Sequence, residues 1–502
     1  AGSSIRSMLP RECEVVARWL HCSVTINVGL RSERGPILIA LMLTTFLVAI
    51  EATVLSTAVP SIVADLGDFP LFPWLFSVYL LAQAVTVPVY AKLADTVGRK
   101  PIILIGIGLF LLGSILSAFA WSMPALIAFR VIQGLGAGAV LPISITIAGD
   151  IYTVEERAKV QGYLASMWAV ASVVGPTLGG LFAQFDAWRG IFIVNIPLCL
   201  LAAWMLTRTF HEKITRTAHR IDYAGAVLLT VALTALLLAV LEGGQAWAWN
   251  SLPSILLFGG GALVLVAFLL VERRAAEPIL PLWVFTRRLV LVVSIFGLGI
   301  GATLTGLTSY VPLYLQGALG VSPLIAGFAL ATLTVGWPIA AAVSGRLYLR
   351  IGFRNTMFIG MGLVLVGTAI LAAFAMTPSI LVVAVSCFFV GLGMGLAATP
   401  SLILAQSSVG WNERGVVTGV NMFARNVGSA VGVAVFGAIA NSIFLRAGAD
   451  SADPAVVTAA GSAVFIAALV VAVATLIATI AMPRTRVQQL PADETDLGLA
   501  EA

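Results

Sequence analysis

Two charged residues of opposite sign, Glu51 and Arg130, are among the few that lie inside long apolar stretches of the sequence, where a charge is costly. Glu51 is the only acidic residue deep in any such stretch, and Arg130 lies within another. A charged side chain at the centre of a bilayer costs about 3 kcal/mol on insertion scales, so such residues usually pair or serve a function. Because burial penalises the charged form of a carboxylate, Glu51 is suited to bind a proton and later release it.

Arg130 is the natural partner of Glu51, because a guanidinium cannot lose its charge in a protein. Beside Glu51 it would favour the ionised carboxylate and so promote release of the proton. Two simpler interpretations stay open. Glu51 could be a structural carboxylate paired with a buried arginine, and Arg130 could cap backbone carbonyls at a helix kink.

Patterns that carry other chemistry do not occur in the sequence. The four cysteines form no CxxC pair, and the three histidines form no zinc-binding pattern. There is no GxxxxGK[ST] phosphate loop, which would indicate ATP-driven pumping, and no GxSxG nucleophile motif. We therefore expect no metal site, no cofactor and no enzymatic activity.

The elements that must hold these two charges are membrane-spanning helices. Of the 502 residues, 60% are hydrophobic and only 10% are charged, against about 25% charged in a soluble domain. This composition excludes a disordered chain, a coiled coil, a disulfide scaffold and a nucleic-acid binder. A helix needs about 20 apolar residues to cross a bilayer. Fourteen stretches qualify: 37–61, 72–91, 101–120, 124–149, 160–184, 190–208, 223–241, 253–271, 289–315, 323–345, 356–376, 380–405, 415–444 and 458–482.

Lysine and arginine are sorted between alternate loops. Of the 28, 24 lie in the N-terminal segment, the even-to-odd loops and the tail, and only two lie in the loops on the other side. The remaining two, Arg130 and Arg425, fall within spans. By the positive-inside rule, both termini are cytoplasmic. We expect a multi-pass protein of the plasma (inner) membrane.

The sequence repeats itself at an offset of 254 to 257 residues. Residues 91–100 align with 345–354, and the glycines at 134, 136 and 138 align with those at 391, 393 and 395. The repeat predicts an all-α integral membrane fold of two pseudo-symmetric six-helix bundles plus two inserted helices. Parallel halves with a site between them are typical of alternating-access transporters.

The expected organisation has five parts. Residues 1–36 form a cytoplasmic segment that is either an interfacial helix or, at its start, residues added for expression. The N-terminal bundle covers 37–209, the two inserted helices with their loops 210–288, and the C-terminal bundle 289–482. Residues 483–502 form a cytoplasmic tail.

These landmarks resemble the major facilitator superfamily, in particular its fourteen-span drug:proton antiporter branch, over about residues 37–482. IEATVLSTAVP (50–60) resembles the branch motif lDxTvvnvAlP, with Glu51 in place of Asp. AKLADTVGRK (91–100) resembles GxLaDrxGrK, with Ala91 for the first Gly and Thr96 for a usual Arg. RVIQGLGAG (130–138) matches RxxQGxGaG, and GPTLGG (175–180) matches GPxxGG. A further marker is WRGIFIVNIP (188–197).

The resemblance implies proton coupling by Glu51 and Arg130 on two helices that line a central cavity. It also implies a conformational latch of Asp95, Arg99, Lys100 and Asp150. Asp95 would face the N-terminus of span 13, where the helix dipole favours an anion, and Arg99 would pair with Asp150. Such contacts would stabilise the outward-facing state. The simpler interpretation is that these charges only mark topology.

The residues Gly175, Pro176, Gly179 and Gly180 correspond to the antiporter motif. Pro176 removes a backbone donor and bends the helix, and the glycines allow another helix to approach closely. The resemblance implies that this segment contacts the other half and controls the outward seal. A packing kink without such a role is the alternative.

We therefore expect a proton-coupled exporter, driven by the proton gradient through alternating access. Spans 9–13 contain no Asp or Glu, so we expect lipophilic neutral or monocationic drugs rather than dications. Alternatives are export of a lipid or amphipathic metabolite, and a non-transporting lipid-handling scaffold. The partners would be these small substrates, protons and membrane lipids, with no nucleic acid, and the chain would be a monomer. Candidate substrate contacts in a large apolar cavity are Thr53, Gln133, Tyr310, Gln406, Asn421 and Arg425.

Overall fold

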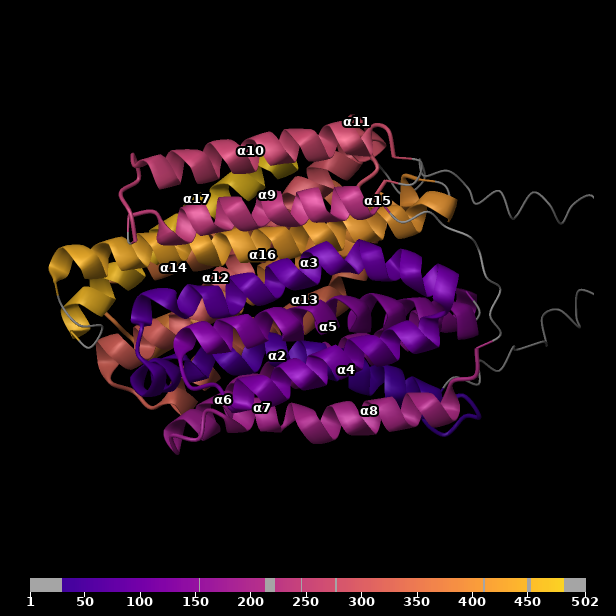
Figure 1. The fold of residues 1–502 in the computed structure, drawn as a ribbon, viewed down its shortest axis with the longest axis horizontal. Helices are drawn as coiled ribbons and strands as arrows, with labels where there is room; N and C mark the ends of the chain where they lie inside the picture. Colours follow the sequence, from indigo (N-terminus) through magenta and orange to yellow (C-terminus); the bar gives the residue numbers. More distant parts are fainter. Residues whose placement is uncertain are drawn as a thin grey trace, which may run out of the picture.

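The computed structural model describes residues 29–152, 154–212, 222–244, 246–275, 278–409, 411–448 and 453–482. Within these ranges, fourteen helices are long and apolar enough to cross a membrane. The expected number of spans is therefore confirmed. The helices lie side by side along the long axis of the molecule, as Figure 1 shows.

The N-terminal bundle contains the first six spans. Its last span is divided into two helices at Val194, because Pro197 has no N–H to donate to the carbonyl of Ile193. The helices are α2 (Gly35–Leu66), α3 (Phe72–Val97, preceded by the short 3₁₀ helix η1, Phe69–Leu71), α4 (Arg99–Ala118), α5 (Met123–Ile151), α6 (Val154–Gln184), α7 (Gly190–Ile193) and α8 (Asn195–Thr209).

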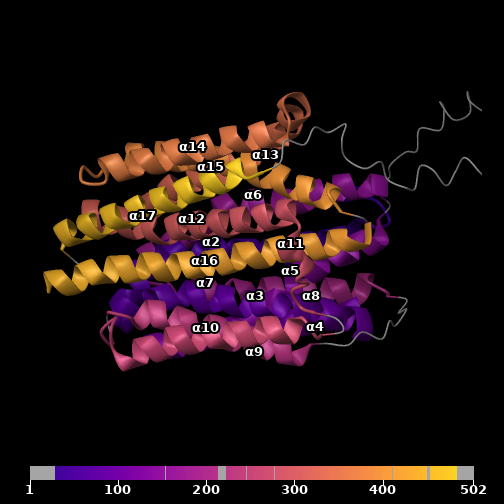
Figure 2. The ribbon, with the colours of Figure 1, turned by 90° about the horizontal axis from the view of Figure 1, so that it is seen from above.

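Two inserted helices, α9 (Tyr223–Glu242) and α10 (Leu252–Glu272), form a hairpin on one side of the molecule. Figure 2 shows both helices along one edge. α9 contacts both bundles, because Leu237 and Leu241 share a buried cluster with Leu81 of α3 and Ala434 of α16. Trp74 of α3 also donates a hydrogen bond of 2.8 Å to the carboxylate of Glu242.

The C-terminal bundle repeats the arrangement of the first. The short helix α11 (Trp283–Thr286) leads into it. Its spans are α12 (Arg288–Leu319), α13 (Pro323–Ile351), α14 (Phe353–Phe374), α15 (Ile380–Ser407), α16 (Trp411–Ala447) and α17 (Pro454–Ile480).

Several helices are longer than the apolar stretches that predict them. α2 has 32 residues and α16 has 37, which correspond to about 48 and 55 Å of helix, against a hydrocarbon core of about 30 Å. Hydropathy marks only the part of a helix inside hydrocarbon, so the polar turns at either end escape such a prediction.

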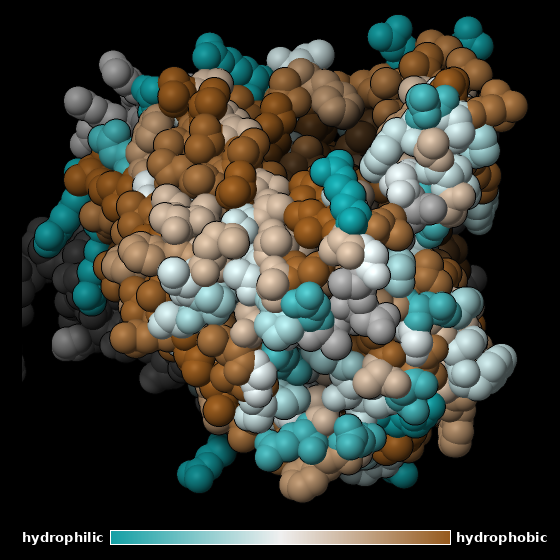
Figure 3. All heavy atoms as spheres, turned by 90° about the vertical axis from the view of Figure 1, so that its left-hand side faces the viewer, coloured by the Kyte–Doolittle hydropathy of each residue, from teal (hydrophilic) through white to brown (hydrophobic). Residues whose placement is uncertain are grey.

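The molecule has two distinct ends. The helix α2 begins and α17 stops at one end, which we call the termini end. The opposite end contains the α2–α3 and α12–α13 turns, and we call it the far end. Figure 3 views the far end, where hydrophilic and hydrophobic side chains are interspersed. The hydrogen bonds between the bundles include Ser77 to the carbonyl of Ala430 at 3.1 Å and Asn441 to the carbonyl of Pro70 at 2.9 Å. These contacts lie from the middle of the molecule to its far end.

Candidate functional site: a buried ring around Glu51

Glu51 and Arg130 form an ion pair in the interior of the N-terminal bundle. The Nη1 of Arg130 donates to the Oε1 of Glu51, and each residue is 2% exposed. Glu51 lies near the middle of α2, and Arg130 lies in the first half of α5. These two intramembrane charges therefore neutralise each other, as the cost of an isolated charge requires.

Three polar side chains complete a closed ring with this ion pair. Arg130 Nη1 donates to Gln133 Oε1 at 2.6 Å, and Gln133 Nε2 donates to Ser114 Oγ at 2.9 Å. Asn195 Nδ2 donates to Glu51 Oε2 at 2.8 Å and approaches Ser114 Oγ at 3.3 Å. The ring thus joins α2, α5, α4 and α8, and all five side chains are buried.

α3 holds the other side of the Arg130 guanidinium. Arg130 Nε donates to the carbonyl of Leu75 at 3.1 Å, and the guanidinium carbon lies 4.2 Å from the centre of the Tyr79 ring. A cation over an aromatic face is stabilised by the ring quadrupole, more strongly when water is excluded. Arg130 is therefore fixed by a carboxylate, an amide, a carbonyl and an aromatic ring.

Local sequence explains why these helices can meet. A Cβ on Gly113 would lie 2.6 Å from the Cα and Cβ of Gln133, so only glycine lets α4 approach α5 closely enough for Ser114 to reach Gln133. On α8, the interruption caused by Pro197 falls one residue before Asn195. The ring therefore depends on Gly113, which lets α4 approach α5, and on Pro197, which interrupts the helix beside Asn195. Another apolar residue at either position would suit a membrane helix but would not allow this arrangement.

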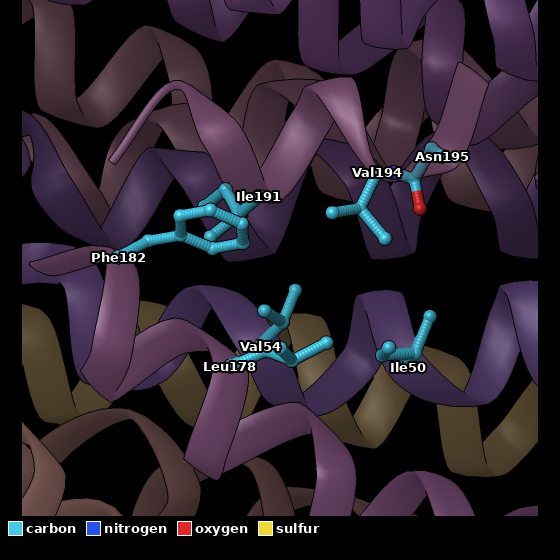
Figure 4. Close-up of a pocket in the computed structure, with 7 residues that line it drawn as sticks. All are labelled: Ile50, Val54, Leu178, Phe182, Ile191, Val194 and Asn195. Carbon is cyan, nitrogen blue, oxygen red and sulfur yellow. The ribbon is translucent and has the colours of Figure 1, made fainter. Parts of the chain in front are cut away.

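A narrow apolar crevice runs beside the ring between α2, α6 and the α7–α8 span. Figure 4 shows its lining, with Phe182 and Ile191 at one end and Asn195 at the other. The remaining lining residues are Ile50, Val54, Leu178 and Val194. Asn195 is thus the one polar residue among those that line this crevice, and its amide bonds to Glu51.

The charges predicted to form the latch cluster at the termini end. Arg99 Nε lies 3.2 Å from Asp150 Oδ2, and Lys100 Nζ donates to the carbonyls of Thr207 and Phe210 at 2.9 and 2.5 Å. The side chain of Asp95 lies outside the described part of the structure. Arg99 and Asp150 belong to one bundle, so their pairing can persist when the bundles move relative to each other.

Glu212 is a member of this cluster that the sequence did not reveal. Its carboxylate accepts the backbone N–H groups of Arg99 and Lys100 at 2.8 and 3.0 Å, at the positive N-terminal end of α4. At the same end, Arg34 pairs with Glu156 at 3.0 Å. Tyr152 donates to the carbonyl of Arg34, and burial raises the pKa of its phenol, an effect that the charge of Arg34 opposes.

The glycines at 175, 179 and 180 lie where helices approach each other closely. A Cβ on Gly175 would overlap Thr53 of α2, and one on Gly179 would overlap the carbonyl of Val54. Gly180 faces the other bundle, where the backbone of Leu324 on α13 is the neighbour. On the same interface, a Cβ on Gly327 of α13 would lie 2.6 Å from the carbonyl of Pro176.

The six candidate substrate contacts do not gather at one place. Gln133 belongs to the ring, and the Thr53 hydroxyl donates to backbone carbonyls of α2 and α6, so both are committed to contacts inside the N-terminal bundle. The 3% exposed Tyr310 packs against Phe72 across the bundle interface.

The other three candidates lie in the C-terminal bundle and are half-buried. Gln406 donates to Thr418 at 2.8 Å, and Asn421 donates to the carbonyl of Val293 at 3.3 Å. Among the described residues, no ion pair is formed by Arg425. It lies on the face of α16 that packs against Gly297 and Gly301 of α12.

Two pseudo-symmetric six-helix bundles, with a buried acid–base pair in one of them, define the architecture of a secondary transporter. The chain belongs to the major facilitator superfamily, whose family model matches residues 41–433. It is therefore a multi-pass membrane transporter and not an enzyme.

Relatives and solved structures agree with this assignment. Multidrug resistance protein 3 of Bacillus subtilis (strain 168) is 34% identical over 410 residues, which cover 81% of this chain and 80% of that protein. Multidrug transporter protein MdtP of the same organism is 32% identical over 82% of this chain and 76% of its own length. The crystal structure of a D-xylose–proton symporter shares the fold at a TM-score of 0.64 and 14% identity, over 90% of this chain and 99% of that chain.

Proposed function

We propose that this transporter exports lipophilic drugs by alternating access and that proton entry drives the export. The observation that carries the proposal is the buried ring around Glu51, which holds the single deep carboxylate against a permanent cation. When Glu51 binds a proton, its attraction to Arg130 falls and the N-terminal bundle can change its packing. The names of the relatives, multidrug resistance protein and multidrug transporter, support drug export.

The proposed orientation has both termini in the cytoplasm, with the chain in the plasma (inner) membrane. The far end then faces outward, and the α6–α13 and α3–α16 contacts form the outward seal. Arg130 lies seven residues from the start of α5 at the far end, which corresponds to about 10 Å of helix. A proton from outside would therefore reach the ring by a short path once the seal opens.

The proposed substrates are neutral or monocationic. Glu51 is committed to Arg130, and no other described carboxylate lies in the middle of a span, since the buried Glu272 is the last residue of α10. Arg425, which forms no ion pair with any described residue, would repel a further positive charge. The transporter would need no cofactor and would act as a monomer, with substrates, protons and lipids as its partners.

The test is efflux of a fluorescent lipophilic monocation from proteoliposomes with an imposed pH gradient. We expect uphill export that stops when an ionophore dissipates the gradient. Export that is unaffected by the ionophore would contradict proton coupling. Displacement of the bound dye only by long-chain lipids would favour lipid export, and export of a dicationic analogue at the same rate would contradict the proposed substrate class.

A further inference from the structure

Asn195 belongs to the ring and bonds directly to the Glu51 carboxylate. Its amide is 1% exposed at the first residue of α8. We propose that Asn195 is a positioning residue that sets how tightly Glu51 holds its proton. This inference rests on the proposed function, in which Glu51 is the proton site.

The direction of the hydrogen bonds matches the ionised form of Glu51. Arg130 donates to Oε1 and Asn195 donates to Oε2, so both carboxylate oxygens act as acceptors. An ionised carboxylate only accepts hydrogen bonds, whereas a protonated one must also donate its O–H. Neither a guanidinium nor an amide N–H can accept that hydrogen. The observed ring therefore has no acceptor for protonated Glu51.

Of the two described partners of the Glu51 carboxylate, Asn195 is the one that can supply the missing acceptor. Half a turn of its amide about χ2 exchanges Nδ2 for Oδ1, and this terminal torsion is broad. The turned amide would accept the Glu51 hydrogen but would give up its N–H contact to Ser114, now 3.3 Å long. Protonation of Glu51 is thereby linked to a turn of Asn195 and to loss of the N–H that now joins α8 to Ser114 of α4, whose hydroxyl would have to rotate and donate instead.

Few other groups act on the charge of Glu51. Among the described residues, the titratable side chains that face it are Arg130 of α5, Tyr79 of α3 and Cys199 of α8. A tyrosine and a cysteine are ordinarily neutral at pH 7. The described acidic and basic side chains of α4, α6, α12 and α13 lie near the termini end. Arg130 and Asn195 are thus the groups that stabilise the ionised carboxylate.

The test measures protonation of Glu51 directly, by difference infrared absorption of its carboxylic acid group in purified protein, with Glu51→Gln as the blank. Asn195→Leu keeps the branched shape of the side chain but removes both the donor and the acceptor. A hydrogen bond to an ionised group is worth more than one to a neutral group, so we expect the midpoint to rise by about one pH unit. The pH midpoint of transport should rise by the same amount.

A second variant and a matched control guard against a folding defect. Ser114→Ala keeps Asn195 but removes the contact that opposes its turn, so we expect a smaller rise in the midpoint. Ser117→Ala, one turn along α4 and outside the ring, removes a buried hydroxyl that has no partner among the described residues, and should keep the wild-type midpoint. Unfolding temperatures report whether each variant is folded.

The outcomes separate this inference from the proposed function. A Glu51 signal that titrates in the wild type, with the same midpoint in Asn195→Leu and Ser114→Ala, would overturn the role of Asn195 and leave the proton site intact. A Glu51 signal that does not titrate between about pH 5 and 9 would overturn the proton site itself.

Discussion

A Cβ on Gly180 of α6 would lie 2.8 Å from the Cα of Leu324 on α13, which belongs to the other bundle. Backbone meets backbone here, so neither side can yield by rotating a side chain. We expect Gly180→Ala to destabilise the closed far end by about 1–3 kcal/mol, the usual cost of overpacking. The population of the closed state relative to the open one should then fall by about 5- to 150-fold.

Cross-linking of cysteines placed across the α3–α16 interface measures this population. The control is Gly108→Ala on α4, where an added Cβ meets nothing within 4 Å. Equal cross-linking in Gly180→Ala and the wild type would contradict the assignment of this contact as the seal.

Orientation in the membrane is tested by labelling single cysteines with an impermeant thiol reagent in intact cells. Ala187 and Asn250 are exposed at the far end, whereas Glu33 and His211 are exposed at the termini end. We expect cysteines at the first two positions to react from outside and those at the last two to react only after the membrane is permeabilised. Labelling of Glu33→Cys in intact cells would contradict cytoplasmic termini.

The native thiols do not disturb this experiment if two of them are removed. Cys199 and Cys387 are buried, and Cys13 and Cys22, which lie outside the described residues, can be replaced by serine.

Gly67 and Gly244 are unsuitable labelling sites, although they also lie at the far end. Their φ angles of 75° and 78° would strain any other residue.

Substitutions of Tyr310 can show whether this residue seals the far end or binds substrate. Its ring contacts Phe72 with centroids 5.3 Å apart, while its buried hydroxyl has no hydrogen-bond partner among the described residues. We expect Tyr310→Phe to transport normally and to be as stable as the wild type or more stable by about 1 kcal/mol. Tyr310→Ala should weaken the seal. A large loss of substrate affinity in Tyr310→Phe would instead indicate that the hydroxyl binds substrate.

The fold follows from the sequence because each span carries its own apolar run, and the two halves carry the same glycines at one offset. The pairing of Glu51 with Arg130 follows as well, since a lone charge in hydrocarbon is too costly to leave unpaired. Asn195 and Ser114 could not be selected in this way. Neutral polar residues are common in membrane helices, and Asn195 was visible only as part of the WRGIFIVNIP marker.

The orientation of side chains around each helix was also beyond sequence analysis. In a membrane protein both the lipid-facing and the buried faces are apolar, so hydropathy does not reveal which face points inward. Thr53 and Gln133 were therefore expected in a cavity between the halves, whereas the structure places their hydrogen bonds inside the N-terminal bundle.

The most direct test of proton coupling is transport by Glu51→Gln in proteoliposomes. The amide mimics the neutral, protonated carboxyl, so the protein should fold and still exchange substrate down its gradient. A proton crossing a potential of about 150 mV supplies about 3.5 kcal/mol, which sustains a substrate gradient of roughly 300-fold. We predict that Glu51→Gln loses this uphill accumulation entirely. Uphill transport by Glu51→Gln at the wild-type rate would contradict the assignment of Glu51 as the proton site.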